Sequence, residues 1–116
     1  MESILTSIKK LLGLSEEYEQ FDADIILHIN TVFINLTQLG VGPQNGFYIE
    51  DSGTTWDEFI NIDEDNQLNA VKTYVYLKVK LLFDPPLSST VLQSINNTIA
   101  ELEWRLNTAV EYNNTY

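Results

Sequence analysis

The chain has 116 residues, which is enough for one domain with a single hydrophobic core. Its 17 acidic and 6 basic residues give a formal net charge of −11 at pH 7, and it contains no cysteine. This composition excludes disulfides, thiolate metal sites and cysteine nucleophiles, and the negative charge opposes binding to a phosphate backbone. No signal peptide or apolar run of membrane-spanning length is evident, so we expect one folded domain made in the cytoplasm.

Two N-terminal segments space their apolar residues three and four apart, as amphipathic helices do. The first, from Ser3 to Leu12, is expected to stop at Gly13. The second begins near Asp22, which can act as its N-cap, and Asp24 then lies favourably in the first turn. Its apolar stripe precedes Gly40 and consists of Ile25, Ile29, Val32, Leu36 and Leu39.

An irregular segment follows, from Gly40 to Gly53, with four glycines and one proline. Within it we expect a short strand from Phe47 to Ile49. Thr55 and Glu58 then have the spacing of a capping box, which predicts a short helical turn carrying Trp56.

The next helix is predicted from Gln67 to Phe83 and closes at Asp84-Pro85-Pro86, because a residue before proline avoids the helical region. Its apolar face comprises Leu68, Val71, Val75, Val79 and Leu82, with Tyr74 and Leu81 broadening it. Its β-branched residues leave a strand open as the alternative, but the periodicity favours a helix. Lys72, Lys78 and Lys80 on this helix are interpreted as a solvent-facing stripe in preference to a binding patch.

The last helix is predicted from Ser89 to Val110, a length of ~33 Å at 1.5 Å per residue. Ser88, Ser89 and Thr90 are its candidate caps, and Thr90 with Gln93 fits a capping box. The narrow apolar seam that packs it lengthwise against another helix consists of Leu92, Ile95, Ile99, Leu102, Leu106 and Ala109. We therefore predict an all-α domain over residues 1–110, with four main helices and one short helical turn, followed by a polar C-terminal tail over residues 111–116.

No motif in the chain predicts catalysis or a bound cofactor or metal. His28 is the only histidine, and neither a dinucleotide-binding nor a phosphate-loop glycine pattern occurs. Asp63 and Asp65 resemble the start of a calcium loop, but Leu68 replaces the required glycine and Tyr74 the bidentate glutamate. We expect that the protein is not an enzyme.

Five stretches, in order along nearly the whole chain, resemble the small head-tail connector proteins of long-tailed phages and prophages of Gram-positive bacteria. They are ILTSIKKLLGL, FDADIILHINTVFINLTQLGVGP, TTWDEFI, AVKTYVYLKVKLLFDPP and ELEWRLN. The most specific is LLFDPP, which precedes the helix that carries ELEWRL.

This resemblance to adaptor or head-completion proteins implies a ring of identical helical subunits on the portal vertex, through which DNA passes toward the tail. The implied partners are other copies of the chain, the portal protein, and the next connector, stopper or tail-completion protein. DNA would only pass through the channel, and no membrane is involved. The implied location is the head-tail junction of the virion, after assembly in the host cytoplasm.

The interface residues are predicted in the Gly40 to Gly53 loop, on the last helix and in the C-terminal tail. Trp104 lies two residues off the apolar seam, so it is either a partner anchor or covered by a second helix of the domain. The hypothesised interface set comprises Phe47, Tyr48, Trp104, Arg105, Tyr112 and Tyr116. The alternative function is a small acidic binding protein, such as a DNA-mimic-type regulator of a mobile element, although the carboxylates are scattered over linkers and helix ends.

Overall fold

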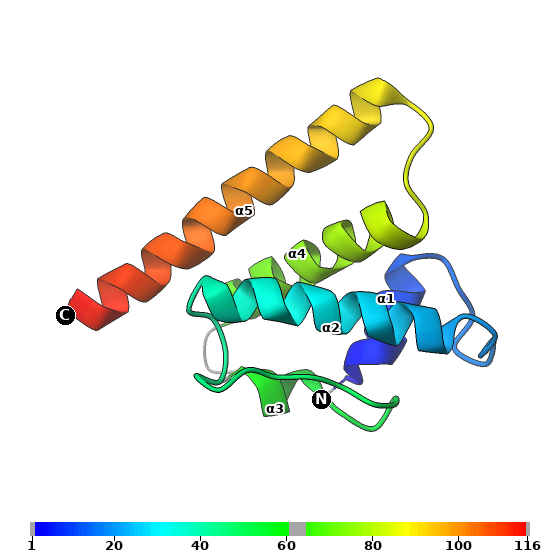
Figure 1. Cartoon of the computed structure of the whole chain (residues 1–116), viewed down its shortest axis with the longest axis horizontal. Coiled ribbons are helices and arrows are strands. Elements are labelled where there is room, and N and C mark those ends of the chain that lie inside the picture. The colour runs from blue at the N-terminus through cyan, green and yellow to red at the C-terminus, as the bar shows by residue number, and fades with distance from the viewer. Residues whose placement is uncertain (1, 61–64, 116) are drawn as a thin grey trace.

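The computed structural model describes residues 2–60 and 65–115, and the side chains within 2–60 and 67–110. In these ranges the chain is helical, without a strand, as the predicted all-α fold requires. Figure 1 shows its five helices, which are α1 (Ile4–Leu11), α2 (Asp22–Gln38), α3 (Trp56–Phe59), α4 (Asp65–Phe83) and α5 (Ser89–Thr115). One isolated antiparallel bridge, between Ser3 and Thr55, joins the start of α1 to the start of α3.

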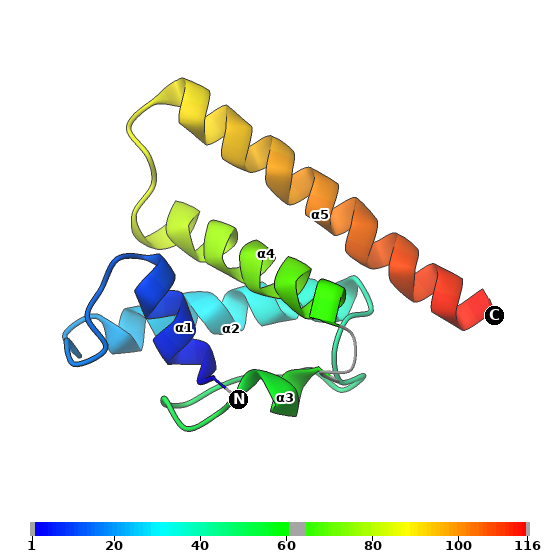
Figure 2. The ribbon, with the colours of Figure 1, turned by 180° about the vertical axis from the view of Figure 1, so that it is seen from behind.

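Helices α2 and α4 pack against each other and form the centre of the molecule. Helix α1 contacts both of them, whereas α5 lies antiparallel along α4 and forms an outer layer (Figures 1 and 2). The C-terminal end of α5 projects past the other helices in both views. The core contains the predicted stripe of the second helix, most of the predicted α4 face, and Ile4 and Ile8 of the first helix, whereas Leu11 is half-exposed.

The first helix is confirmed, with Ser3 as its N-cap and a backbone φ of 84° at Gly13 behind its end. The predicted capping role of Asp22 is wrong, because Phe21 is the N-cap of α2 and Asp22 is already its first helical residue. The Asp22 carboxylate instead pairs with the buried Lys9, whose Nζ lies 2.8 Å from Asp22 Oδ1. Asp22 neutralises the buried Lys9 ammonium, which explains why its carboxylate does not cap the helix.

The predicted strand from Phe47 to Ile49 is not formed, and a side chain on α2 explains why. Asn30 Oδ1 accepts a hydrogen bond from the Ile49 amide at 2.8 Å, and Asn30 Nδ2 donates to the Ile49 carbonyl at 3.0 Å. One amide side chain therefore takes the place of a neighbouring strand, and the segment stays extended without a β-partner. The capping box of Thr55 and Glu58 is confirmed, with the Thr55 amide 2.7 Å from Glu58 Oε2.

Helix α4 buries four of its five predicted face residues, but Leu82, in its last turn, is half-exposed. Helix α5 is capped by Ser88, whose hydroxyl accepts from the Val91 amide at 3.3 Å. The predicted capping box of Thr90 and Gln93 is wrong, because Thr90 already lies inside the first helical turn. Helix α5 also continues through residues 111–115, which the sequence had assigned to a polar tail.

Candidate interaction surfaces

Two predicted interface aromatics on the loop between α2 and α3 have different environments. Phe47 is half-buried, and its ring centroid lies 5.3 Å from that of Phe33 and 5.1 Å from that of Phe59. Tyr48, the next residue of the extended segment, is 66% exposed. Because successive side chains of an extended chain point to opposite sides, Phe47 fastens the loop to the core while Tyr48 faces solvent.

The two tryptophans have opposite environments. Trp56 is fully buried, its Nε1 donates to Ser7 Oγ at 2.8 Å, and the Lys72 ammonium lies 5.8 Å from its ring. Trp104 is 67% exposed on α5, so no second helix of the domain covers it. A large aromatic that remains in water is a typical anchor for a protein partner.

Of the other interface residues predicted near the C-terminus, only Arg105 has a described side chain. Arg105, next to Trp104, is exposed and forms a 2.7 Å ion pair with Glu101 one turn earlier. Tyr112 belongs to α5, but its side chain lies outside the described residues, as does Tyr116 altogether. The α2–α3 loop beyond residue 46 runs on the side of the molecule away from α5, so Tyr48 and Trp104 do not form one site (Figures 1 and 2).

Every basic side chain already has a partner within the described chain. Lys9 pairs with Asp22, Lys10 and Lys72 with Glu2, Lys80 with Asp84, Arg105 with Glu101, and Lys78 lies 5.5 Å from the Tyr74 ring centroid. The three α4 lysines are also half-buried, which differs from the predicted solvent-facing stripe. The described surface therefore offers no cluster of free cations to a phosphate backbone.

A depression of about 400 Å³ lies where α1 meets the segment before α2. Glu16, Glu17, Glu19 and Asp22 line it together with Lys9. The Lys9 ammonium donates to the Glu16 carbonyl at 2.9 Å and pairs with Asp22, so it holds the α1–α2 connection closed. The residues that line this depression therefore have a structural role, which is to hold α1 against the segment before α2.

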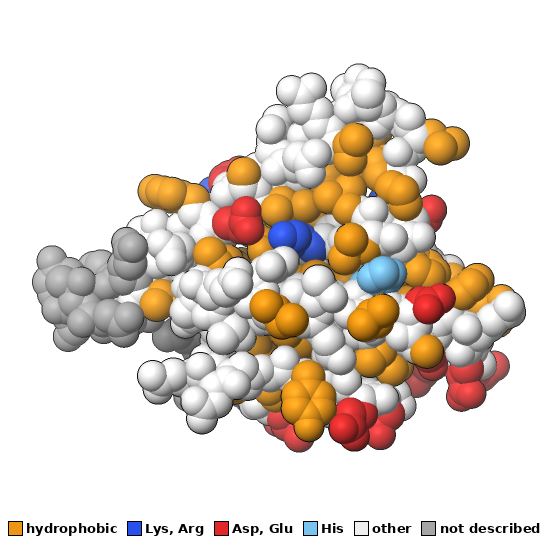
Figure 3. Space-filling model, viewed as in Figure 1, with side chains coloured by type: hydrophobic (Ala, Val, Ile, Leu, Met, Phe, Trp, Pro, Cys, Tyr) orange, Lys and Arg blue, Asp and Glu red, His pale blue; other side chains and the backbone are white. Residues whose placement is uncertain are grey.

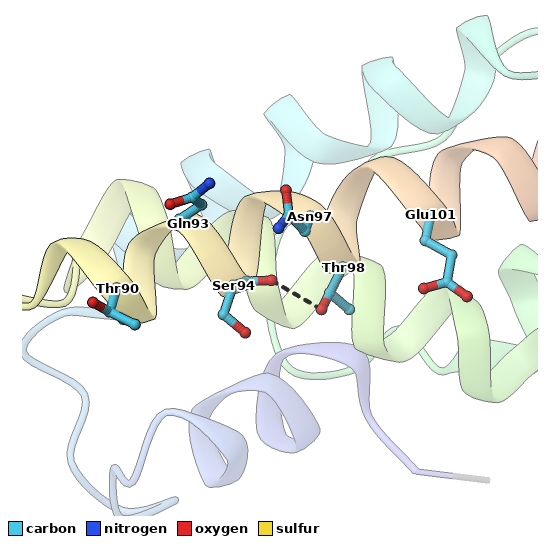
Figure 4. A pocket seen from close by; sticks show the side chains of 6 residues that line it. All are labelled: Thr90, Gln93, Ser94, Asn97, Thr98 and Glu101. Carbon is cyan, nitrogen blue, oxygen red and sulfur yellow. Dashed lines mark hydrogen bonds between the residues drawn. The ribbon is translucent and has the colours of Figure 1, made fainter.

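A second, shallow depression of about 360 Å³ follows one side of α5. Figure 4 shows that its lining comes from one helix, namely Thr90, Gln93, Ser94, Asn97, Thr98 and Glu101. The one hydrogen bond drawn there runs from Thr98 Oγ1 to the Ser94 carbonyl at 3.0 Å. Hydroxyls and amides with a single carboxylate suit hydrogen bonding to a partner and lack a paired acid and base.

The described residues include neither a metal site nor a membrane-spanning helix. Among them, no three side chains of the His, Cys, Asp and Glu types are grouped so that they could hold a metal ion. None of their helices combines the length and apolar character that a membrane span needs.

Comparison with known proteins links this architecture to a family. No curated protein and no solved structure matches the chain. A family model described as phage connector protein matches residues 4–113, from the start of α1 almost to the end of α5. The family consists of structural proteins, and membership implies a component of the virion. The chain therefore belongs to the phage connector protein family.

Proposed function

We propose that the protein is a head-tail connector subunit that assembles as a ring on the portal vertex and joins the DNA-filled head to the tail. The observation that carries this proposal is the family match over residues 4–113, which covers nearly all of the described helices. The match does not support the alternative of an acidic, DNA-mimicking regulator. Further partners would be the portal protein and the next connector, stopper or tail-completion protein.

The charge distribution supports passage of DNA through such a ring. DNA-binding proteins gain affinity when free lysines and arginines release counterions from phosphates. Here the basic side chains are engaged by acidic or aromatic neighbours, and the net charge is −11. A channel built from such subunits would let DNA slide past, because the wall would not hold the phosphates.

Exposed aromatic residues supply anchors for the assembly contacts. Trp104 offers a large ring beside the Glu101–Arg105 ion pair, and Tyr48 offers a second exposed ring on the α2–α3 loop. Both are of the types enriched at the centres of protein interfaces. We assign Arg105, Phe47, Tyr112 and Tyr116 to the same contacts, with Phe47 acting by fixing the loop that carries Tyr48.

Complementation of a phage deleted for this gene tests the proposal. We expect the deletion to leave heads and tails unjoined in electron micrographs, and the unmodified gene to restore joined particles. Trp104→Ala should fail to restore them although the protein stays folded, because Trp104 is exposed. Leu11→Ala, which trims another exposed apolar side chain on α1, is the matched control and should restore joining. Joined particles in the deletion itself would refute the proposal.

A further inference from the structure

Charge is distributed unevenly along this acidic chain. No Asp, Glu, Lys or Arg occurs in residues 25–49 or in residues 85–100, so all 17 acidic and 6 basic residues lie elsewhere. The first stretch forms most of α2 and the loop after it, and the second forms the α4–α5 connection and the first half of α5. Burial explains only part of this pattern, because both stretches also contribute exposed side chains.

One uncharged surface runs along the outer side of α2. Leu27, Thr31, Ile34 and Gln38 are exposed and follow one another at spacings of four, three and four, so they form a single stripe. Leu27 is 63% exposed and Ile34 is 61% exposed. We call these four residues the α2 face. The middle of the side on which α2 lies in front shows mostly orange and white atoms, with blue Lys or Arg atoms and the pale blue histidine among them (Figures 1 and 3).

A second uncharged surface lies at the start of α5. Leu87 is fully exposed, with a relative exposure of 105%, and Val91, four residues later, is also exposed. Thr90, Ser94 and Asn97 continue this surface as small hydrogen-bonding side chains (Figure 4). We call these five residues the α5 face.

Electrostatics favours these two faces for contact between copies. Each copy carries a net charge of −11, so identical copies repel wherever their carboxylates approach. Burial of an unpaired charge is costly, and the cores of protein interfaces are depleted of charged residues. An assembly of identical acidic chains is therefore expected to use the surfaces that lack charge.

The occupant of these faces is expected to be protein. DNA is a poorer occupant than protein for these faces, because phosphates give no partner to aliphatic side chains such as Leu87 and Ile34.

We infer that the α2 face of one copy docks on the α5 face of the next copy, which makes this the repeating contact of the proposed ring. Two different patches on one subunit are what a cyclic, head-to-tail assembly requires. The inference rests on the proposed function, because it names the surfaces through which the proposed ring closes.

Matched charge substitutions test the two faces in the full chain. Ile34→Glu alters the α2 face and Ser94→Glu alters the α5 face, while Thr73→Glu adds the same charge at an exposed threonine of α4 outside both. With portal particles present, we expect ring formation to weaken at least about tenfold in both face variants, because each buries an unpaired carboxylate. The Thr73→Glu control should assemble normally, and all three should keep their helical circular dichroism.

Cysteine crosslinking then identifies which faces meet, since the chain has no native cysteine. With a bismaleimide reagent, the double variant Ile34→Cys, Ser94→Cys should give a ladder of multimers on the portal, whereas each single variant should stay monomeric. Crosslinked dimers from a single variant, or intact rings without a ladder, would overturn the α2–α5 contact and leave the proposed ring standing. Rings that still form with Ser94→Glu but no longer pass DNA would place the α5 face on the channel wall. That result would also overturn the α2–α5 contact. Failure of the unmodified chain to form rings on the portal would instead refute the proposed function.

Discussion

Gly42 and Gly46 differ in what surrounds them, although both have a left-handed backbone. Their φ angles are 88° and 94°, which glycine adopts without cost and other residues rarely adopt. A Cβ on Gly42 would lie 2.3 Å from Phe59 Cε2, whereas a Cβ on Gly46 would meet nothing within 4 Å. Phe59 is buried between Phe33 and Phe47, so its ring has little room to retreat.

We therefore predict that Gly42→Ala lowers the free energy of unfolding by about 2 to 4 kcal/mol, from backbone strain plus overpacking. Gly46→Ala carries only the strain and should cost about 1 kcal/mol. Urea unfolding followed by circular dichroism measures both values. Equal losses for the two variants would show that the Phe59 ring yields easily.

The Lys9–Asp22 pair gives a second prediction at this scale. Lys9 is buried, and Asp22 Oδ1 has this ion pair but no well-aligned hydrogen bond among the described residues. Asp22→Asn should lower the free energy of unfolding by about 2 to 4 kcal/mol, because it leaves a buried ammonium without its counterion. Lys10→Met removes an exposed pair with Glu2 and should cost less than about 0.5 kcal/mol. A loss for Asp22→Asn no larger than that control would contradict the assigned role of the pair.

Among the elements, helices were predictable from sequence because their stabilising contacts recur every three to four residues. Proline and glycine marked where α1, α2 and α4 end. The extended loop segment was misread as a strand, because its hydrogen-bonding partner is the side chain of Asn30, 19 residues away in sequence. The exposure of Leu82 could not be predicted from the spacing of apolar residues either, because it depends on how far α5 covers α4.

The Asn30 clamp predicts a local effect on the loop. Asn30→Ala removes both hydrogen bonds to Ile49 and should lower the free energy of unfolding by about 2 kcal/mol. The Ile49 amide should also exchange its hydrogen faster, which native-state hydrogen exchange detects. Thr31→Ala, at the adjacent exposed position, is the control. Unchanged exchange at Ile49 would mean that the Phe47 ring alone holds the loop.

One hydrogen bond ties α5 to α4, from the buried Tyr74 hydroxyl to Glu103 Oε2 at 2.8 Å. Burial, then the hydrogen bond and charge of Glu103, raise the pKa of Tyr74 above its usual value of 10.0. The unfolded chain therefore loses this proton at lower pH than the folded chain. The stability that this pKa shift contributes is complete below about pH 10 and is lost as the pH rises further.

Tyr74→Phe should accordingly cost about 1 to 2 kcal/mol at neutral pH. Between about pH 9 and 11 the unmodified protein should lose stability more steeply than Tyr74→Phe, since the other tyrosines titrate in both. Urea unfolding over this pH range measures the two slopes. Parallel curves would show that the Tyr74 proton does not stabilise the α4–α5 contact.

The whole molecule packs α1, α2 and α4 together and adds α5 as an outer layer, and it exposes one uncharged face on α2, a second on α5, and Trp104. Sequence patterns predicted the class of fold, because it depends on local periodicity, but they left open whether Trp104 is exposed or covered. They could not place the surfaces relative to one another, since the separation of Tyr48 from α5 arises only when the helices pack. The proposed role in assembly follows from these surfaces together with membership of the phage connector family.

Cryo-electron microscopy of the full chain mixed with portal particles from the phage or prophage that encodes it tests the central claim most directly. The protein alone, shown to be helical by circular dichroism, is the control for self-assembly. We predict a ring of helical subunits seated on the portal vertex and coaxial with the DNA channel. Folded protein that leaves the portal vertex bare at high concentration would contradict the connector role.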